Sequence, residues 1–243
     1  PLVSALLMVF CMGVFPWVVV RSRIFNLRNT SHRNIRFGFT PDYREAYRVF
    51  LWWQLLLPVT MGVLVPYIYY RQRRFLVENS RYGTTPFRFH ATPGQYFRIF
   101  LPLVILFPVA LAAAVAAIML KPSALTMTLP AVLFFVLYLC ALLYVRTALT
   151  NLTWSSTSLG DHRFTSALRV RDLLWIYFSN AVAVTCSLGL MAPWAAVRLL
   201  RYRLERLTAA GAGGFDAILA SQETQVGAAP EELGDMLGFD LGL

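Results

Sequence analysis

Five apolar runs alternate with arginine-rich polar regions along the chain. None of the runs holds an Asp, Glu, Lys, Arg or His: Leu2–Val20, Val49–Tyr70, Phe100–Leu120, Leu125–Val145 and Leu173–Val197. A helix needs about 20 predominantly apolar residues to cross a bilayer core, so each run is long enough to span. The pattern predicts an all-α integral membrane bundle.

Short stretches of alternating apolar and polar residues lie between these runs. Ile35–Phe39 and Thr85–His90 both repeat with a period of two, which is typical of a strand. We therefore expect short β-strand segments within the connecting regions of the helical bundle.

Two of the apolar runs resemble each other at a fixed offset in the numbering. The matched pairs are Gly62/Gly189, Pro66/Pro193, Tyr67/Trp194, Arg71/Arg198 and Arg74/Arg201, all at a spacing of 127. In the preceding region Arg21/Arg146, Asn26/Asn151 and Phe39/Phe164 match at a spacing of 125. The pattern predicts an internal duplication, with repeat halves at about 1–121 and 122–206 in one membrane domain (1–206). An acidic cytoplasmic tail (207–243) follows.

The same two runs are interrupted by residues that disturb helices. The candidate break positions are Pro58, Gly62, Pro66, Gly189, Pro193 and Trp194. A proline removes one amide donor and disturbs the preceding turn. The runs are therefore either kinked spanning helices, which membranes tolerate, or re-entrant hairpins that enter and leave on one side.

The composition argues against an ordinary soluble domain. Hydrophobic residues make up 58% of the chain and charged residues 14%, with a net charge of +10 and a mean hydropathy of +0.57. The basic residues are arginines beside apolar runs, apart from Lys121, so they fit the positive-inside rule. We expect no nucleic-acid binding, because no recognised binding motif accompanies the charge.

Counting these charges separates the two topologies. If all five runs span, 12 basic residues lie on one side and 10 on the other. If 49–70 and 173–197 are re-entrant, 21 lie on the cytoplasmic side and only Lys121 lies outside. The second arrangement agrees far better with the orientation rule.

Little in the sequence indicates catalysis. The runs lack the buried ionisable groups that mark proton relays, and their mid-segment polar residues are few: Gln54, Thr60, Ser179, Asn180, Thr185 and Ser187. Neither the histidines (His32, His90, His162) nor the cysteines (Cys11, Cys140, Cys186) have metal-site or redox spacing. We expect no enzyme, no cofactor and no metal site.

The arginines that follow the two broken runs are candidate contacts for anionic lipid headgroups. They are Arg71, Arg74, Arg198 and Arg201. Near a membrane surface each such charge contributes about 1 kcal/mol of attraction to anionic lipid. They either set orientation only or bind a specific anionic ligand.

Several blocks resemble the YjgN-like family of bacterial inner-membrane proteins of unknown function. The main block is Leu188–Tyr202, which is similar to the family signature TLG…PWAKVR..RY, although Ala196 stands where that signature has Lys. Other similar blocks are Arg28–Ser31, Tyr82–Phe89, Asn151–Trp154, Arg169–Trp175 and Phe239–Leu243. The resemblance implies a multi-pass protein of the bacterial inner membrane and carries over no catalytic residue. Because the chain begins at Pro1 inside an apolar run, we expect an N-terminal part with a further repeat to precede it.

The sequence therefore gives two hypotheses about function. The first is a multi-pass inner-membrane protein with a structural, lipid-binding or regulatory role, whose partners are membrane lipids and, as a further expectation, other copies of the chain. Its arginine-rich loops and tail face the cytoplasm. The alternative is a transporter or channel for a small solute, with the path between the Pro/Gly-broken segments.

Overall fold

The computed structural model describes residues 2–32, 35–119 and 124–211. Its helices are α1 (Leu2–Arg28), α2 (Tyr43–Tyr47), the π-helix η1 (Arg48–Trp52), α3 (Trp53–Leu55), α4 (Val65–Glu78), α5 (Pro93–Met119), α6 (Ala124–Ser155), α7 (Val170–Cys186) and α8 (Ala192–Glu205). Its strands are β1 (Ser31–His32), β2 (Ile35–Phe39), β3 (Ser80–Tyr82), β4 (Thr85–Phe89), β5 (Thr157–Leu159), β6 (His162–Ser166) and β7 (Leu207–Ala210).

All of these strands join in one antiparallel sheet of seven strands, which runs β1 to β7 in sequence order and curls into a half-barrel. Pairs such as Phe39 with Ser80, Phe89 with Thr157 and Ser166 with Leu207 join strands that are far apart in the sequence. The prediction of an all-α bundle with short strands confined to its connecting regions was therefore wrong. Alternation located β2 and β4, but a period of two carries no information about a distant pairing partner.

Aromatic side chains pack along this sheet. Phe37, Phe87 and Phe164 come from β2, β4 and β6, with ring centroids 6.5 and 6.3 Å apart. Tyr82 on β3 packs against Phe37 at 4.8 Å and is only 2% exposed, and Ile35 is also buried there. Such cross-strand pairs stabilise a sheet made of strands that are each very short.

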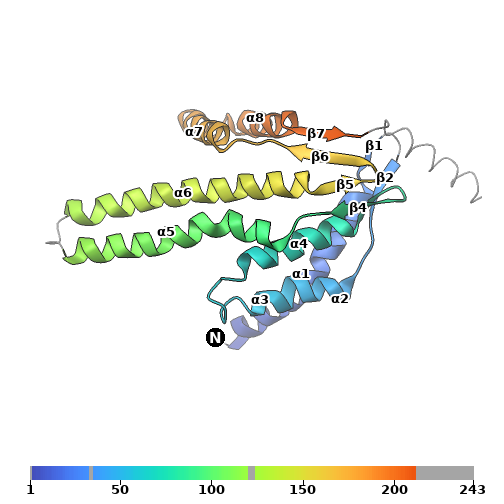
Figure 1. The fold of residues 1–243 in the computed structure, drawn as a ribbon, viewed down its shortest axis with the longest axis horizontal. Helices are drawn as coiled ribbons and strands as arrows, with labels where there is room; N and C mark the ends of the chain where they lie inside the picture. The colour runs from blue at the N-terminus through green and yellow to red at the C-terminus, as the bar shows by residue number, and fades with distance from the viewer. Residues whose placement is uncertain (1, 33–34, 120–123, 212–243) are drawn as a thin grey trace, which may run out of the picture.

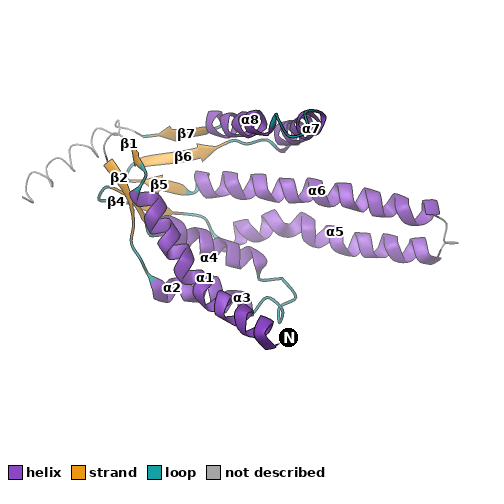
Figure 2. Ribbon diagram, turned by 180° about the vertical axis from the view of Figure 1, so that it is seen from behind, coloured by secondary structure: helices purple, strands orange, loops and turns teal. Residues whose placement is uncertain are grey.

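The helices extend from the sheet, and α5 and α6 form the longest pair (Figure 1). The α3–α4 segment lies on one side of this pair and α7–α8 on the other, and the view from behind has the same order (Figure 2). Three helices of the described residues are long and apolar enough to cross a membrane, by length and composition: Phe10–Arg28, Pro93–Ala113 and Pro130–Ser155. They include most of three of the five apolar runs.

The other two runs each fold as a helical hairpin. Run 49–70 forms part of η1, all of α3, a turn and the start of α4, whereas 173–197 forms most of α7, a turn and the start of α8. In the first hairpin Phe50 packs on Phe75, and Trp53 packs on Tyr67. In the second hairpin the Tyr202 hydroxyl donates a hydrogen bond to the Asp172 carboxylate, and the Asn180 side chain donates one to the Ala195 carbonyl. The legs of each hairpin are therefore antiparallel.

Matching elements in the two halves begin at the same offset of 127 in the numbering. Helices α2 and α7 begin at Tyr43 and Val170, and β2 and β6 begin at Ile35 and His162. In this register Phe164 corresponds to Phe37 and not to Phe39, because Phe37 pairs with Tyr82 and Phe164 with Ala209. In the sheet the pair Phe39/Phe164 at a spacing of 125 is therefore replaced by Phe37/Phe164 at 127. The duplication itself stays a prediction, and these bounds support it.

The buried residues cluster where the helices meet the sheet. Val20, Phe39, Ala46, Val49, Phe50 and Phe75 form one cluster, and Tyr70, Phe89, Ala91, Tyr96, Val145 and Leu149 form another. Farther from the sheet, α5 and α6 have exposed apolar side chains, among them Val104 and Val132. Packing among the described residues therefore fixes the sheet end, and the outer surfaces of α5 and α6 are apolar and exposed.

Tyr82 tests how much the sheet depends on its aromatic packing. Tyr82→Ala should lower the free energy of unfolding by about 3–5 kcal/mol, because it leaves a cavity beside Phe37. Tyr82→Phe should cost only about 1 kcal/mol, since it keeps the ring and removes the hydroxyl, which donates a hydrogen bond to the His32 carbonyl (2.8 Å). Denaturant unfolding of the protein in detergent measures both, and equal losses for the two variants would contradict the packing account.

Candidate functional site

The two helical hairpins turn by the same backbone device. Met61 and Leu188 have φ values of 47° and 51°, and Gly62 and Gly189 follow them with φ values of 82° and 93°. The amide of Gly62 donates to the Leu57 carbonyl (3.0 Å), and that of Gly189 donates to the Val184 carbonyl (2.8 Å). This six-to-one closure with a left-handed residue before it is the Schellman-type ending of a helix. The predicted break at Gly189 thus follows the end of α7, and the break at Gly62 lies in the turn region between α3 and α4.

The prolines of these segments begin helices and do not kink them. Pro66 and Pro193 are each the second residue of a helix, α4 and α8, where the missing amide removes no helical hydrogen bond. Pro58 is exposed and lies in the first turn region, between α3 and α4. Trp194 is 47% exposed, and its ring stacks under the Arg198 guanidinium at 5.3 Å.

The four predicted lipid contacts have different surroundings. Arg71 forms an ion pair with Glu45 across the first hairpin, and Arg74 pairs with Glu78 on its own helix at 3.0 Å. The hydrogen bond with Glu78 raises the pKa of Arg74, so this side chain stays charged. Arg198 donates to Ser179 Oγ (2.7 Å) and Asn180 Oδ1 (3.1 Å). Arg201 is exposed, with no hydrogen bond or ion pair to the described residues.

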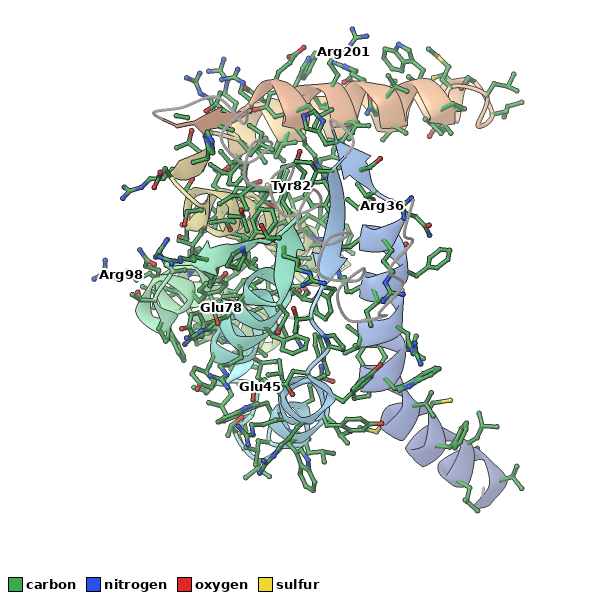
Figure 3. The ribbon with its side chains drawn as sticks, turned by 90° about the vertical axis from the view of Figure 1, so that its right-hand side faces the viewer. Arg36, Glu45, Glu78, Tyr82, Arg98 and Arg201 are labelled. Atoms are coloured by element: carbon green, nitrogen blue, oxygen red, sulfur yellow. The ribbon has the colours of Figure 1, made fainter. Side chains whose placement is uncertain are left out.

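Viewed from the sheet end, Arg98 and Arg201 point away from the molecule (Figure 3). Glu45 and Glu78 lie among the helices of the first hairpin in the same view. The described residues include twenty arginines and six acidic residues, so most of the positive charge has no acidic partner. This end of the molecule is therefore strongly basic.

Polar side chains hold the legs of the second hairpin together. Asp172 accepts a hydrogen bond from the Tyr202 hydroxyl (3.0 Å) and lies 3.6 Å from the Arg206 guanidinium. Asn180 is buried and donates to the Ala195 carbonyl (3.1 Å). Asp172 occupies the position that Glu45 has in the first hairpin, at the same offset as the matched glycines. Both hairpins thus carry a carboxylate at the same place, and each uses it between its two legs.

A cavity of about 410 Å³ opens beside the first hairpin, between α1, α3 and α4. It combines polar and apolar side chains: Arg23, Gln54, Tyr69, Gln72 and Arg73, with Leu57, Val65, Ile68 and Leu76. Neither Arg23 nor Arg73 has a hydrogen bond or an ion pair with a described residue, and their positive charges repel one another. No acidic side chain lines this cavity.

A second cavity, of about 770 Å³, follows α7 and is largely apolar. Trp175 and Phe178 line it and are each 64% exposed, and Arg171 and Asp172 lie at the same cavity. It is a groove on the outer face of the second hairpin, made chiefly of aromatic and aliphatic surface.

The histidines lie on or beside the sheet, and the cysteines lie on the helices α1, α6 and α7. His90 Nε2 lies 2.9 Å from Ser158 Oγ, and His162 is buried on β6. The three cysteines are free thiols. Within the described residues, no three His, Cys, Asp or Glu side chains come together as a metal site would require.

Sequence reasoning missed the joint position of Arg23 and Arg73. Both were counted only as charges that set orientation. Two signals in the sequence could have found them. One helix face is indicated by the spacing of Val65, Ile68, Tyr69, Gln72, Arg73 and Leu76. The second half of the chain also lacks both arginines, because the residues 127 positions after Arg23 and Arg73 are Thr150 and Leu200.

Comparison with known proteins identifies the family. A family model described as "Bacterial protein of unknown function (DUF898)" matches residues 1–236. The chain belongs to the DUF898 family. The resemblance to YjgN-like proteins is consistent with this membership. Searches of curated proteins and of solved structures found no match. The family gives a bacterial origin, and any role for this DUF898 chain must be argued from its own residues.

The two turns predict that alanine in place of either turn glycine lowers the free energy of unfolding, whereas alanine in place of a glycine inside a helix raises it. Gly62→Ala and Gly189→Ala should each lower the free energy of unfolding by about 1–2 kcal/mol, because alanine is strained at positive φ although the added methyl group meets no atom within 4 Å. Gly94→Ala in α5 is the control, since its methyl group also has free space and its φ is not positive. It should stabilise by about 0.5–1 kcal/mol. Thermal unfolding in detergent distinguishes the signs, and stabilisation by all three would refute the strained turn.

Proposed function

We propose that this DUF898 protein is a multi-pass protein of the bacterial inner membrane that binds anionic phospholipids, with a structural or regulatory role there. The observation that carries the proposal is the chemistry of the two hairpin turns. Met61 and Leu188 are each 94% exposed, and their neighbours Val59, Val63 and Leu190 are 79%, 67% and 85% exposed. Side chains this apolar, at the tip of a protruding turn, are stable in hydrocarbon and unfavourable in water.

In this proposal α1, α5 and α6 cross the bilayer. Their outer surfaces are apolar and exposed, which a lipid environment explains without a protein partner. The sheet forms the cytoplasmic layer, because the arginines gather at that end and positive residues are retained on the cytoplasmic side. The aromatic residue Trp17, stacked with Arg21 at 5.6 Å, has the character of an interface residue near the end of α1.

The two hairpins enter this membrane differently. The first packs against α1 and α5, so it dips into the bilayer beside two spans and returns to the sheet. The second extends across the view in which α5 and α6 are seen end-on (Figure 3). An amphipathic hairpin in that orientation lies along the membrane surface, with Trp175 and Phe178 toward the acyl chains and the basic residues of α8 toward the headgroups.

The arrangement does not favour a solute path between the two broken segments. Helices α5 and α6 lie between the first and the second hairpin in Figures 1 and 2. A shared path would need the two turns to face each other. The proposal accordingly contains no transport and no catalytic step, and its partners are anionic headgroups.

Depth measurements test the proposal. In a variant without Cys11, Cys140 and Cys186, single cysteines at Met61 and Leu188 are labelled with an environment-sensitive fluorophore and reconstituted into phosphatidylglycerol vesicles. Both labels should be quenched by lipids that carry a spin label on the acyl chain and should resist quenching by aqueous iodide. A cysteine at Asp161, an exposed residue between β5 and β6, is the control and should give the reverse. Tip labels that behave like the Asp161 label would contradict the insertion of the turns.

A further inference from the structure

The strongest unexplained feature outside the hairpin turns is the pair of arginines in the 410 Å³ cavity. The sequence Arg71-Gln72-Arg73-Arg74 shows the contrast within a single helical turn of α4. Arg71 has Glu45 as its partner and Arg74 has Glu78, whereas Arg73 shares its cavity with a second cation, Arg23 from α1. The fold therefore neutralises two of the three arginines of this block and leaves the third beside a like charge.

The cavity side of α4 is a continuous stripe. Val65, Ile68, Tyr69, Gln72, Arg73 and Leu76 follow each other at intervals of three, one, three, one and three residues, which keeps them on one helix face. Along the stripe the apolar Val65 and Ile68 lie nearest the turn, the polar Tyr69, Gln72 and Arg73 follow, and Leu76 is the last member before the sheet. A ligand in this cavity would thus meet apolar side chains toward the turn and cationic ones toward the sheet.

These side chains suit a phosphate group. A guanidinium donates two parallel hydrogen bonds to phosphate oxygens, and two guanidinium groups can hold one phosphate from two helices. Gln72 and the hydroxyl of Tyr69 on α4, and Gln54 on α3, add neutral donors that line the same cavity. A bound anion would also remove the repulsion between Arg23 and Arg73. The volume lies within the range of about 300–1,000 Å³ that is usual for small-ligand sites.

The second hairpin provides an internal comparison. The residues 127 positions after the polar lining residues are Thr150 for Arg23, Ala181 for Gln54, Ala196 for Tyr69, Leu199 for Gln72 and Leu200 for Arg73. The second half therefore forms the same turn without any of these groups. The hairpin does not need the two arginines in order to fold, so their presence in the first copy calls for a different explanation.

We infer that the cavity between α1, α3 and α4 is a specific binding site for a phosphate group, held between Arg23 and Arg73. This inference rests on the proposed function, because Arg23 follows Trp17 and Arg21 near the end of a candidate span, which is the depth of lipid headgroups. The phosphate belongs either to a membrane phospholipid or to a soluble phosphate compound from the cytoplasm. The shared chemistry is one anionic phosphate in a two-arginine clamp.

Binding measurements on the purified full chain in a nonionic detergent test the inference. Isothermal titration is carried out with inorganic phosphate and, separately, with short-chain phosphatidylglycerol below its micelle concentration. Arg23→Gln and Arg73→Gln should each weaken the binding at least tenfold, and the double variant should abolish it. Arg163→Gln, which removes one exposed charge on β6 whose side chain has no partner among the described residues, is the matched control and should change the affinity less than twofold.

The double variant Arg23→Thr with Arg73→Leu tests whether binding is lost without misfolding of the protein. It introduces the residues found 127 positions later in the second half of the chain, Thr150 in α6 and Leu200 in α8, so its melting temperature should stay close to that of the parent while binding is lost. Binding of the phosphatidylglycerol alone assigns the site to a lipid headgroup, and binding of inorganic phosphate assigns it to a soluble compound. If neither ligand binds, or if Arg163→Gln weakens binding as much as Arg73→Gln, the specific site is disproved. That failure would leave the depth of the Met61 and Leu188 labels unchanged, so it is distinguishable from a failure of the proposed function.

Discussion

The structure depends on one continuous hydrogen-bonded ladder of very short strands. Each strand pairs with the next in sequence order, so the ladder ties the ends of all the long helices to one layer. Strands this short expose amide and carbonyl groups that need partners, and a single hairpin of this size is marginal in water. Closure of the ladder across β2–β3, β4–β5 and β6–β7 supplies those partners, and the aromatic contacts of Phe37, Phe87 and Phe164 reinforce it. The helices then have to leave the layer from fixed points.

Because the sheet fixes where the helices begin and end, the same hairpin backbone can carry two different sets of side chains. Both hairpins end their first leg with the same left-handed turn and start the second leg with a proline. Beyond that turn their chemistry diverges. The first hairpin uses Glu45 to neutralise Arg71 and leaves Arg73 facing Arg23, whereas the second closes its legs through Asp172, Tyr202 and Asn180. The backbone is thus a shared scaffold, and the side chains on its inner face give the first copy a cationic cavity.

Local features of the sequence predicted much of the fold, and pairing over distance did not follow from them. The strand at Ile35–Phe39 has the predicted bounds, and the breaks at Gly62 and Gly189 are where the hairpins turn. The sheet was missed because the pairing of Phe89 with Thr157 leaves no mark in either segment. For the same reason the site was found only in part. Gln54 stood out as a polar residue in an apolar run, but the meeting of Arg23 and Arg73 depends on how α1 packs against α4.

The most direct test of the account is the sidedness of the three β-hairpins. Single cysteines at Ser31, Thr84 and Asp161, in a variant without native cysteines, are treated in intact bacteria with a thiol reagent that cannot cross the inner membrane. A single sheet requires all three residues to lie on the same side, and in the proposed topology the positive-inside rule makes that side the cytoplasm. The account predicts that none of the three is labelled until the cells are opened, whereas a cysteine at Ser123, in the sequence between the second and third candidate spans, is labelled at once. Labelling of Thr84 in intact cells, with Ser31 still protected, would contradict the account, because the segment between them would then cross the membrane and the sheet could not form.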